Sequence, residues 1–314
     1  MNKILFIYSD NSEKSLVALL EDALKAVLRK FRKSVSFSKV LLDMSVTCRD
    51  AMMEILSESI SASDGVLWLG KKEQSAFEKN FALKCLNAHS KEYIFGGKCI
   101  CSPFCSFNAK LNDESISLNV ETSISSIQHA AKIAADAAKE RNKKILLCTD
   151  TSSPYDTMLA KEMENSISDA RSFDIDYYDF DELIYTLSRK VVPCDSVLCS
   201  EDKAHIIEVN MNSLNKFPVG YTVWHCENAR IYKREFLPYE NSGNLSYASM
   251  LIAAGNMLEK ELGFKGAGIH LKKAAAHTLE KCFSAHQDEF HRQLLFEINV
   301  PIRNRQVNKN DSNN

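Results

Sequence analysis

The stretch from Glu121 to Asp150 constrains the fold more than any other part of this chain. It reads ETSISSIQHAAKIAADAAKERNKKILLCTD. Its apolar residues recur at three- and four-residue steps, which is typical of one face of a helix: Ile124, Ile127, Ala131, Ala134, Ala135 and Ala138. Thr122 or Ser123 can cap this helix, and the apolar run that follows it suits a strand covered on both faces. A helix that leads directly into a buried strand predicts an α/β fold.

Composition excludes several classes of protein. The chain has 314 residues, a formal net charge of -2 and 45% hydrophobic residues, which is ordinary for a soluble globular protein. It has no basic run interleaved with aromatic residues and no apolar run of about 20 residues, so we expect neither a nucleic-acid nor a membrane partner. Residues 3–10 read better as a first strand than as a signal peptide, so we expect a cytoplasmic protein.

The cysteines and glycines point away from two kinds of site. The ten cysteines lie partly inside apolar runs, which favours reduced core thiols over disulfides. Cys99, Cys101 and Cys105 form a C-x-C-x3-C group without a CxxC or histidine partner, and their role is left open. The chain has ten glycines and none between Gly97 and Gly220. Nucleotide sites need glycine where the backbone approaches phosphate, so a phosphate-binding loop has few places to form.

The remaining sequence alternates helices and strands in an order that resembles the isopropylmalate/isocitrate dehydrogenase family. The residues that resemble it are Thr149-Asp150-Thr151 at the end of the strand, SASDGVLWLGKKE at 61–73, residues 175–200, and ASMLIAAGNMLEKELG at 248–263. The resemblance implies that family's α/β fold, with helices on both faces of a mixed sheet. It also implies a first domain from residues 1–102 and 244–314 and an inserted second domain from residues 103–243. Near the C-terminus we expect a helix over 265–282 and an edge strand at LLFEINV.

The resemblance locates the family's catalytic groups at positions that have changed here. The general acid–base lysine of the family falls on Thr151, and its substrate-clamping arginines fall between Arg49 and Arg141, where this chain has no arginine. A guanidinium binds a carboxylate through two parallel hydrogen bonds, which a lysine cannot do. Between Phe104 and Val120 we expect only one strand (115–120) and a turn. The family's tyrosine and projecting dimer arm are therefore predicted to be absent.

The positions that correspond to metal and cofactor ligands have changed as well. In the family, the aspartate at Asp181 binds the neighbouring subunit's divalent metal, but here we expect it to cap a helix. The other two metal aspartates fall on His205 and Val209, and a hard cation needs several carboxylate oxygens. We therefore expect His205 to be partly exposed on a helix and predict no metal ligand.

The cofactor positions lead to the same expectation. Residues 9–12 (Ser-Asp-Asn-Ser) replace the family's glycine-rich turn. His225 falls where the adenine-binding loop opens, but Cys226 replaces the glycine that should follow. We predict no bound cofactor and expect His225 to pack at a strand end.

Two functional hypotheses follow from the resemblance and its losses. The first is a non-catalytic regulatory or ligand-binding subunit with a degenerate site, in which the interdomain cleft binds a small molecule. The alternative is an active NAD- and Mg²⁺-dependent decarboxylating 2-hydroxy-acid dehydrogenase, with a rearranged site built on Asp150, Asp181, His205 and Lys98. As partner we expect a second copy of the chain or an intact paralogue. It would bind through helical faces that include Met158, Leu159 and Met163 and are centred on Ala131, Ala134 and Ala135. The alternative is that the alanine face is core within its own domain.

Overall fold

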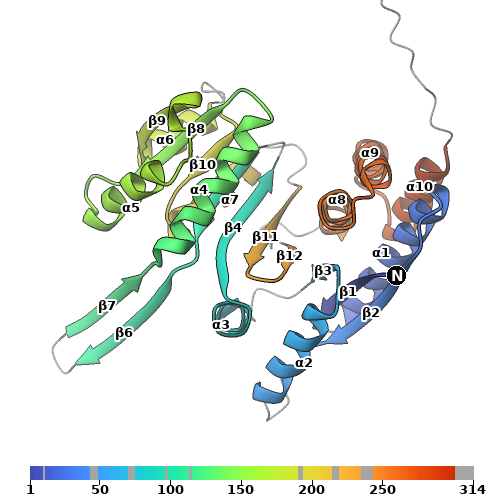
Figure 1. Cartoon of the computed structure of the whole chain (residues 1–314). Coiled ribbons are helices and arrows are strands. Elements are labelled where there is room, and N and C mark those ends of the chain that lie inside the picture. The colour runs from blue at the N-terminus through green and yellow to red at the C-terminus, as the bar shows by residue number, and fades with distance from the viewer. Residues whose placement is uncertain are drawn as a thin grey trace, which may run out of the picture.

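The computed structural model describes residues 1–9, 11–42, 49–69, 75–95, 98–112, 115–189, 194–213, 219–234 and 243–300. Its main element is a ten-stranded mixed sheet (Figure 1). The strands lie in the order β2 (Val35–Leu41), β1 (Asn2–Tyr8), β3 (Gly65–Trp68), β12 (Arg230–Arg234), β11 (Gly220–Cys226), β4 (Ala88–Phe95), β5 (Lys98–Pro103), β10 (Ser196–Leu198), β8 (Lys144–Thr149) and β9 (Asp174–Asp179). Both ends of this sheet are parallel, whereas β11 pairs antiparallel with β12 and β4, and β4 pairs antiparallel with β5.

Helices cover both faces of the sheet. One face carries α1 (Asn11–Lys30), α8 (Gly243–Lys260), α9 (Lys265–Cys282) and α10 (Gln287–Asn299) at the β1 end, and α4 (Ile124–Lys139) and α5 (Pro154–Asn165) at the β8 end. The opposite face carries α2 (Arg49–Ser61) and α3 (Ser75–Cys85), then α6 (Phe180–Ser188) and α7 (Glu201–Ser213). Successive strand residues point to opposite faces; thus Val223 packs under α8 and Trp224 under α3. The predicted α/β fold with helices on both faces is confirmed, and the two-domain division stays a prediction.

The helix–strand unit predicted at 121–150 forms as α4 and β8. The Ser123 side chain caps α4 by accepting a hydrogen bond from the Ser126 backbone N–H at 3.1 Å. Ala131 and Ala134 are fully buried and Ala135 is 6% exposed, all within the core that α4 makes with the sheet and α5. The alanine face is therefore intrachain core, and the prediction that it lies at a subunit contact is wrong. Small side chains here let the helix lie close to the sheet.

Glycines also set the packing of α8 against α9. A Cβ on Gly268 would lie 2.3 Å from the Gly255 backbone oxygen, so only glycine permits this approach. Gly263 follows the end of α8 with φ of +68°, a conformation that glycine adopts without strain. Among the described residues, no helix is long and apolar enough to cross a membrane.

Two other predictions about elements are wrong. Residues 104–120 were expected to hold one strand and a turn, but β6 (Ser106–Asn112) and β7 (Ser115–Glu121) form a two-stranded hairpin that projects from the body (Figure 1). Only two residues separate β6 from β7, so two strands of seven residues fit between residues 104 and 121. LLFEINV belongs to α10 and is not an edge strand; Leu294 and Ile298 are four residues apart on the buried face of this helix.

Candidate functional site

The carboxyl ends of β5, β8, β9 and β10 lie at one edge of the sheet, and α7 begins there, shortly after β10 ends. In open α/β sheets, ligands bind outside the carboxyl ends of the strands. Asp150 and Thr151, which follow β8, and residues 201–209, which begin α7, lie at this edge.

The centre of the edge holds a buried ion cluster, which we call the Glu201 cluster: Glu201, Lys79, Lys91 and Cys105. The Glu201 carboxylate, on the first residue of α7, is only 9% exposed. It pairs with the Lys79 ammonium of α3 at 2.7 Å and with Lys91 of β4. It also accepts hydrogen bonds from the Cys105 backbone N–H at 3.2 Å and from the Cys105 thiol at 3.0 Å. One carboxylate thus joins α3, β4, α7 and the segment that follows β5.

The electrostatics of the cluster favour an ionised Glu201. Burial by itself raises the pKa of this carboxyl, but the attraction of Lys91 and Lys79 outweighs it and lowers the pKa to about 2. Aromatic rings complete the surroundings of the lysines. Lys91 lies 4.9 Å from the ring centre of Phe104, and Lys79 lies 4.3 Å from that of Phe107. Both lysines therefore have partners within the chain itself.

A second ion pair lies at the end of β8. The Asp150 carboxylate pairs with Lys203 of α7 at 2.7 Å and accepts a hydrogen bond from the Ser152 backbone N–H at 3.0 Å. Hydrogen bonds from Lys203 and Ser152 lower the pKa of Asp150 to about 2. Thr151, at the position of the family's lysine, donates both its N–H and its hydroxyl to Asp179 at 3.2 Å.

The structure separates Lys98 from Asp150, two of the residues proposed for a rearranged site. Lys98 begins β5 and is level with the start of β8, whereas Asp150 follows the end of β8. A strand of six residues spans about 20 Å at a rise of about 3.3 Å per residue. The His205 side chain is 65% exposed, with its Nδ1 atom 3.8 Å from Glu208. Asp181 lies in the first turn of α6, and Asp179 caps this helix instead, so the predicted cap at Asp181 is wrong.

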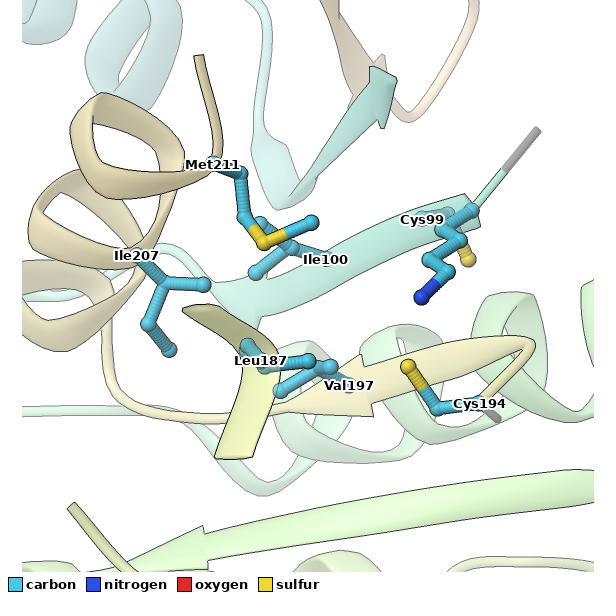
Figure 2. A pocket seen from close by; sticks show the side chains of 8 residues that line it. Cys99, Ile100, Leu187, Cys194, Val197, Ile207 and Met211 are labelled. Atoms are coloured by element: carbon cyan, nitrogen blue, oxygen red, sulfur yellow. The ribbon is translucent and has the colours of Figure 1, made fainter. Parts of the chain in front are cut away.

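Lys98 lines a small apolar cavity between β5, β10 and the helices α6 and α7 (Figure 2). Figure 2 shows Cys194, Met211 and Ile207 facing this space. Its volume is about 10 Å³, which holds at most one water molecule.

Burial, and the nearby carboxylate of Glu201, raise the pKa of the Cys105 thiol far above its ordinary range. The C-x-C-x3-C group thus consists of buried thiols.

Near the start of α1, the Glu13 carboxylate is paired within the chain. The Glu13 carboxylate accepts hydrogen bonds from the Ser9 N–H at 2.6 Å and hydroxyl at 2.7 Å, and it pairs with Arg234 at 3.2 Å. On the opposite face of β12, the Lys233 ammonium pairs with Glu78 of α3 at 3.1 Å. Glu13 is buried, so its carboxylate occupies the Ser9 N–H and hydroxyl within the chain. Asp10 and residues 235–242 lie outside the described residues.

His225 does not open a loop. It lies near the end of β11, and after a short turn the chain returns as β12. Its imidazole is buried, with Nε2 3.1 Å from the Glu92 carboxylate. The expected packing role at a strand end is observed, but the placement of a loop directly after His225 is wrong. Residues 230–234 form a strand instead, because they pair with β3 on one side and with β11 on the other.

One open hollow adjoins this edge, and we call it the α3–α4 hollow. It has a volume of about 610 Å³ and lies between the end of α3, the base of the hairpin, the start of α4 and the β11–β12 turn. Its lining includes Asn87, His89, Phe104, Glu121, Ser126 and Glu227. A volume of this size is in the range of small-molecule sites.

Comparison with known proteins identifies the fold. No protein-family model and no curated protein sequence matches this chain. Solved structures do match. An apo β-decarboxylating dehydrogenase from Thermococcus kodakarensis has a TM-score of 0.72 at 13% identity, covering 95% of this chain and 96% of its own. An isocitrate dehydrogenase from Methylococcus capsulatus has a TM-score of 0.73 at 14% identity, covering 95% of this chain and 99% of its own.

This chain has the fold of the decarboxylating dehydrogenases. A protein from Thermus thermophilus matches it as well, with a TM-score of 0.76 at 14% identity over 97% of this chain and 70% of that one. The predicted resemblance is thereby confirmed at the level of the fold. Identities this low do not transfer the neighbours' activity.

The residues present do not fit the metal or the cofactor of that resemblance. A hard cation needs converging carboxylate oxygens, but Glu201 faces two lysines and His205 faces solvent. Among the described residues, no group of three or more His, Cys, Asp or Glu side chains could hold a metal ion. Near the turn where the resemblance places the cofactor, Glu13 accepts the hydrogen bonds of the Ser9 N–H and hydroxyl, which are then not available to a phosphate. No reaction step is therefore derived through either group.

The sequence analysis missed the Glu201 cluster. Glu201 lies 122 residues from Lys79 and 110 residues from Lys91, and nothing in the spacing of these residues links them. Two features of the sequence could have suggested an ion cluster. The stretch between Arg49 and Arg141 has lysines but no arginine, and α7 begins with two acidic residues, Glu201 and Asp202.

Proposed function

We propose that this chain is a non-catalytic member of the decarboxylating-dehydrogenase fold, acting as a ligand-binding or regulatory subunit. The observation that carries the proposal is the Glu201 cluster. In the resemblance, the segment that begins at Glu201 supplies metal ligands, and the arginine-free region that contains Lys79 and Lys91 supplies the substrate clamp. Here these two segments neutralise each other, because Glu201 takes the place that a bound carboxylate would have beside the lysines.

The second support is the position of the family's lysine. Thr151 has no side-chain group that titrates near neutral pH, and its hydroxyl donates to Asp179. Loss of one proton-transfer group lowers a rate by roughly 10²- to 10⁴-fold. The α3–α4 hollow remains as the ligand site of the proposed subunit, because it is large enough for a small molecule.

The test is a turnover and binding assay on the full chain. NAD⁺ or NADP⁺, Mg²⁺ or Mn²⁺, and isopropylmalate or isocitrate are supplied together, and absorbance of the reduced cofactor is followed against a heat-killed control. We expect no turnover. Turnover of roughly 1 s⁻¹ or more would overturn the proposal and favour the alternative, an active dehydrogenase with a rearranged site.

Binding is read separately from turnover. Thermal melts with and without Mn²⁺ should coincide, because no convergent carboxylates are found among the described residues. A saturable rise in melting temperature with Mn²⁺ would show that a metal site forms after all. Titration calorimetry with the same organic acids and with NADH then reports whether the hollow takes any of them.

The proposed partner is a second copy of the chain or an intact paralogue. The β6–β7 hairpin projects from the body, and an isolated two-stranded sheet is marginal in water, so a surface on another chain would stabilise it. Phe107 of the hairpin is 46% exposed. Light scattering at micromolar concentration tests this assembly. A monomer that also fails to bind a paralogue would exclude it.

A further inference from the structure

Three histidines from three different elements form a row on the face of the sheet that α4 covers. His89 lies on β4, His129 on α4 and His225 on β11. The ring centres of His89 and His129 are 5.6 Å apart, and those of His129 and His225 are 5.5 Å apart. We call these residues the histidine row. The chain has eight histidines in total, so three in one row, with His129 in contact with both others, concentrate titratable groups at one place.

Each end of the row has a different environment. At the inner end, His225 contacts Glu92 at 3.1 Å, and both side chains are buried. In the middle, the Ser90 hydroxyl lies 2.8 Å from Nδ1 of His129. At the outer end, His89 lines the α3–α4 hollow. The row therefore runs from solvent in the hollow to a buried carboxylate.

The charged groups around the row come from every neighbouring element. On β4 these are His89 and Glu92, on β11 His225, and on α4 itself Lys132. Two further cations act on the row electrostatically. Arg230 of β12 lowers the pKa of His129, and Lys260 of α8 lowers the pKa of Glu92. On β5 the ionisable group beside Glu92 is the buried Cys101 thiol.

Except for Glu92, the charges nearest to His129 are cationic or become cationic on protonation. Burial, and then the neighbouring His225 and His89, lower the pKa of His129 to about 4. Burial alone would raise the pKa of Glu92, but the hydrogen bond from His225 and the nearby cations lower it. Glu92 thus stays ionised and His129 stays neutral at neutral pH. A proton added to His129 would place like charges side by side.

The row and the hollow share the first turns of α4. Ser125 and Ser126 line the hollow and precede His129 by one helical turn. On the opposite wall, Asn87 and Ala88 lead directly into His89. Any movement of His129 away from β4 therefore changes the separation of the two walls.

We propose that the histidine row is a proton-operated switch for the α3–α4 hollow. Proton uptake from solvent by His129 produces repulsion from His225 and His89, separates the first turns of α4 from the start of β4, and widens the hollow. The proposal rests on the proposed function only in taking the hollow as the ligand site.

The test is hydrogen–deuterium exchange of the unliganded full chain at pH 7.5 and pH 4.5, corrected for the intrinsic pH dependence of exchange. We expect the opening equilibrium of residues 122–130 to rise about tenfold or more at the lower pH. In His129→Gln this rise should disappear. His277→Gln is the matched control, because His277 is 65% exposed and lies on α9, and it should retain the full rise.

A second measurement follows the titration itself. The imidazole C–H resonance of His129 should titrate near pH 4 in the unmodified chain, and its midpoint should move upward in His89→Gln. Titration near the ordinary 6.5, or an equal exchange rise in His129→Gln, would overturn the proposal. Because both readouts use the chain without ligand or cofactor, their failure is distinct from failure of the turnover and binding assays.

Discussion

Replacing Glu201 by Gln is the most direct perturbation of the site. The substitution keeps the shape of the side chain and removes the charge that Lys79 and Lys91 face. Glutamine can still accept the hydrogen bond from the Cys105 N–H. The effect therefore isolates the electrostatic contribution of one buried carboxylate to stability.

The magnitude follows from the pKa and from the burial of the cluster. The pKa of Glu201 falls from an ordinary 4.5 to about 2, and a shift of this size corresponds to about 3 kcal/mol. Breaking a buried ion pair from one side typically costs about 3–5 kcal/mol. The lysines here are 26% and 24% exposed, so water offsets part of the loss. We expect Glu201→Gln to lower the free energy of unfolding by about 2–3 kcal/mol at neutral pH.

The sign of the pH dependence is a second check. The folded-state pKa of Glu201 is lowered, so its stabilisation is fully present above pH 4.5 and is lost as the pH falls from 4.5 toward 2. The unmodified chain should lose this contribution across that interval. In Glu201→Gln the corresponding slope should be absent, because glutamine does not titrate.

Urea unfolding at several pH values measures both quantities. Glu140→Gln is the control, because Glu140 is exposed just after α4, and it should change stability by less than about 0.5 kcal/mol. Lys91→Met alone and combined with Glu201→Gln completes a double-mutant cycle. If Glu201→Gln is as stable as the unmodified chain, the cluster does not hold the edge together, and the argument for a neutralised site loses its basis.

Three further predictions concern single residues. Ala134→Arg should abolish the folded state, seen as loss of far-UV circular dichroism, because Ala134 is fully buried between α4 and the sheet and an unpaired charge would enter the core; a folded monomer would contradict the core assignment. Ser153→Ala should cost about 1 kcal/mol of stability in urea unfolding, because the Ser153 side chain caps α5 at 3.2 Å; Thr151→Ala, outside the helix cap, is the comparison. Lys203→Gln should raise the pKa of Asp150 from about 2, measured by carboxyl carbon NMR, because the lysine is its ion-pair partner; an unchanged pKa would assign the effect to Ser152 alone.

Local sequence patterns predicted those helices and strands whose formation depends only on residues that are close together in the chain. The alanine period and the two candidate caps, Thr122 and Ser123, indicated α4, and the structure selects Ser123 as the cap. Period and capping chemistry act within a few residues, so no tertiary information was needed. The edge strand predicted at LLFEINV was wrong because the sequence there is ambiguous. A short apolar run fits a strand and a buried helix face equally well.

The sequence by itself determined the α/β fold, through the order of its elements, and the absence of the family's arginines and lysine at the expected positions. Only the tertiary structure decided what replaced them. The Glu201 cluster joins residues 122 and 110 positions apart, and the histidine row joins three elements from distant parts of the chain. Such contacts depend on strand order and on which face each side chain takes, and a shift of one residue in register would place every strand side chain among them on the opposite face of the sheet.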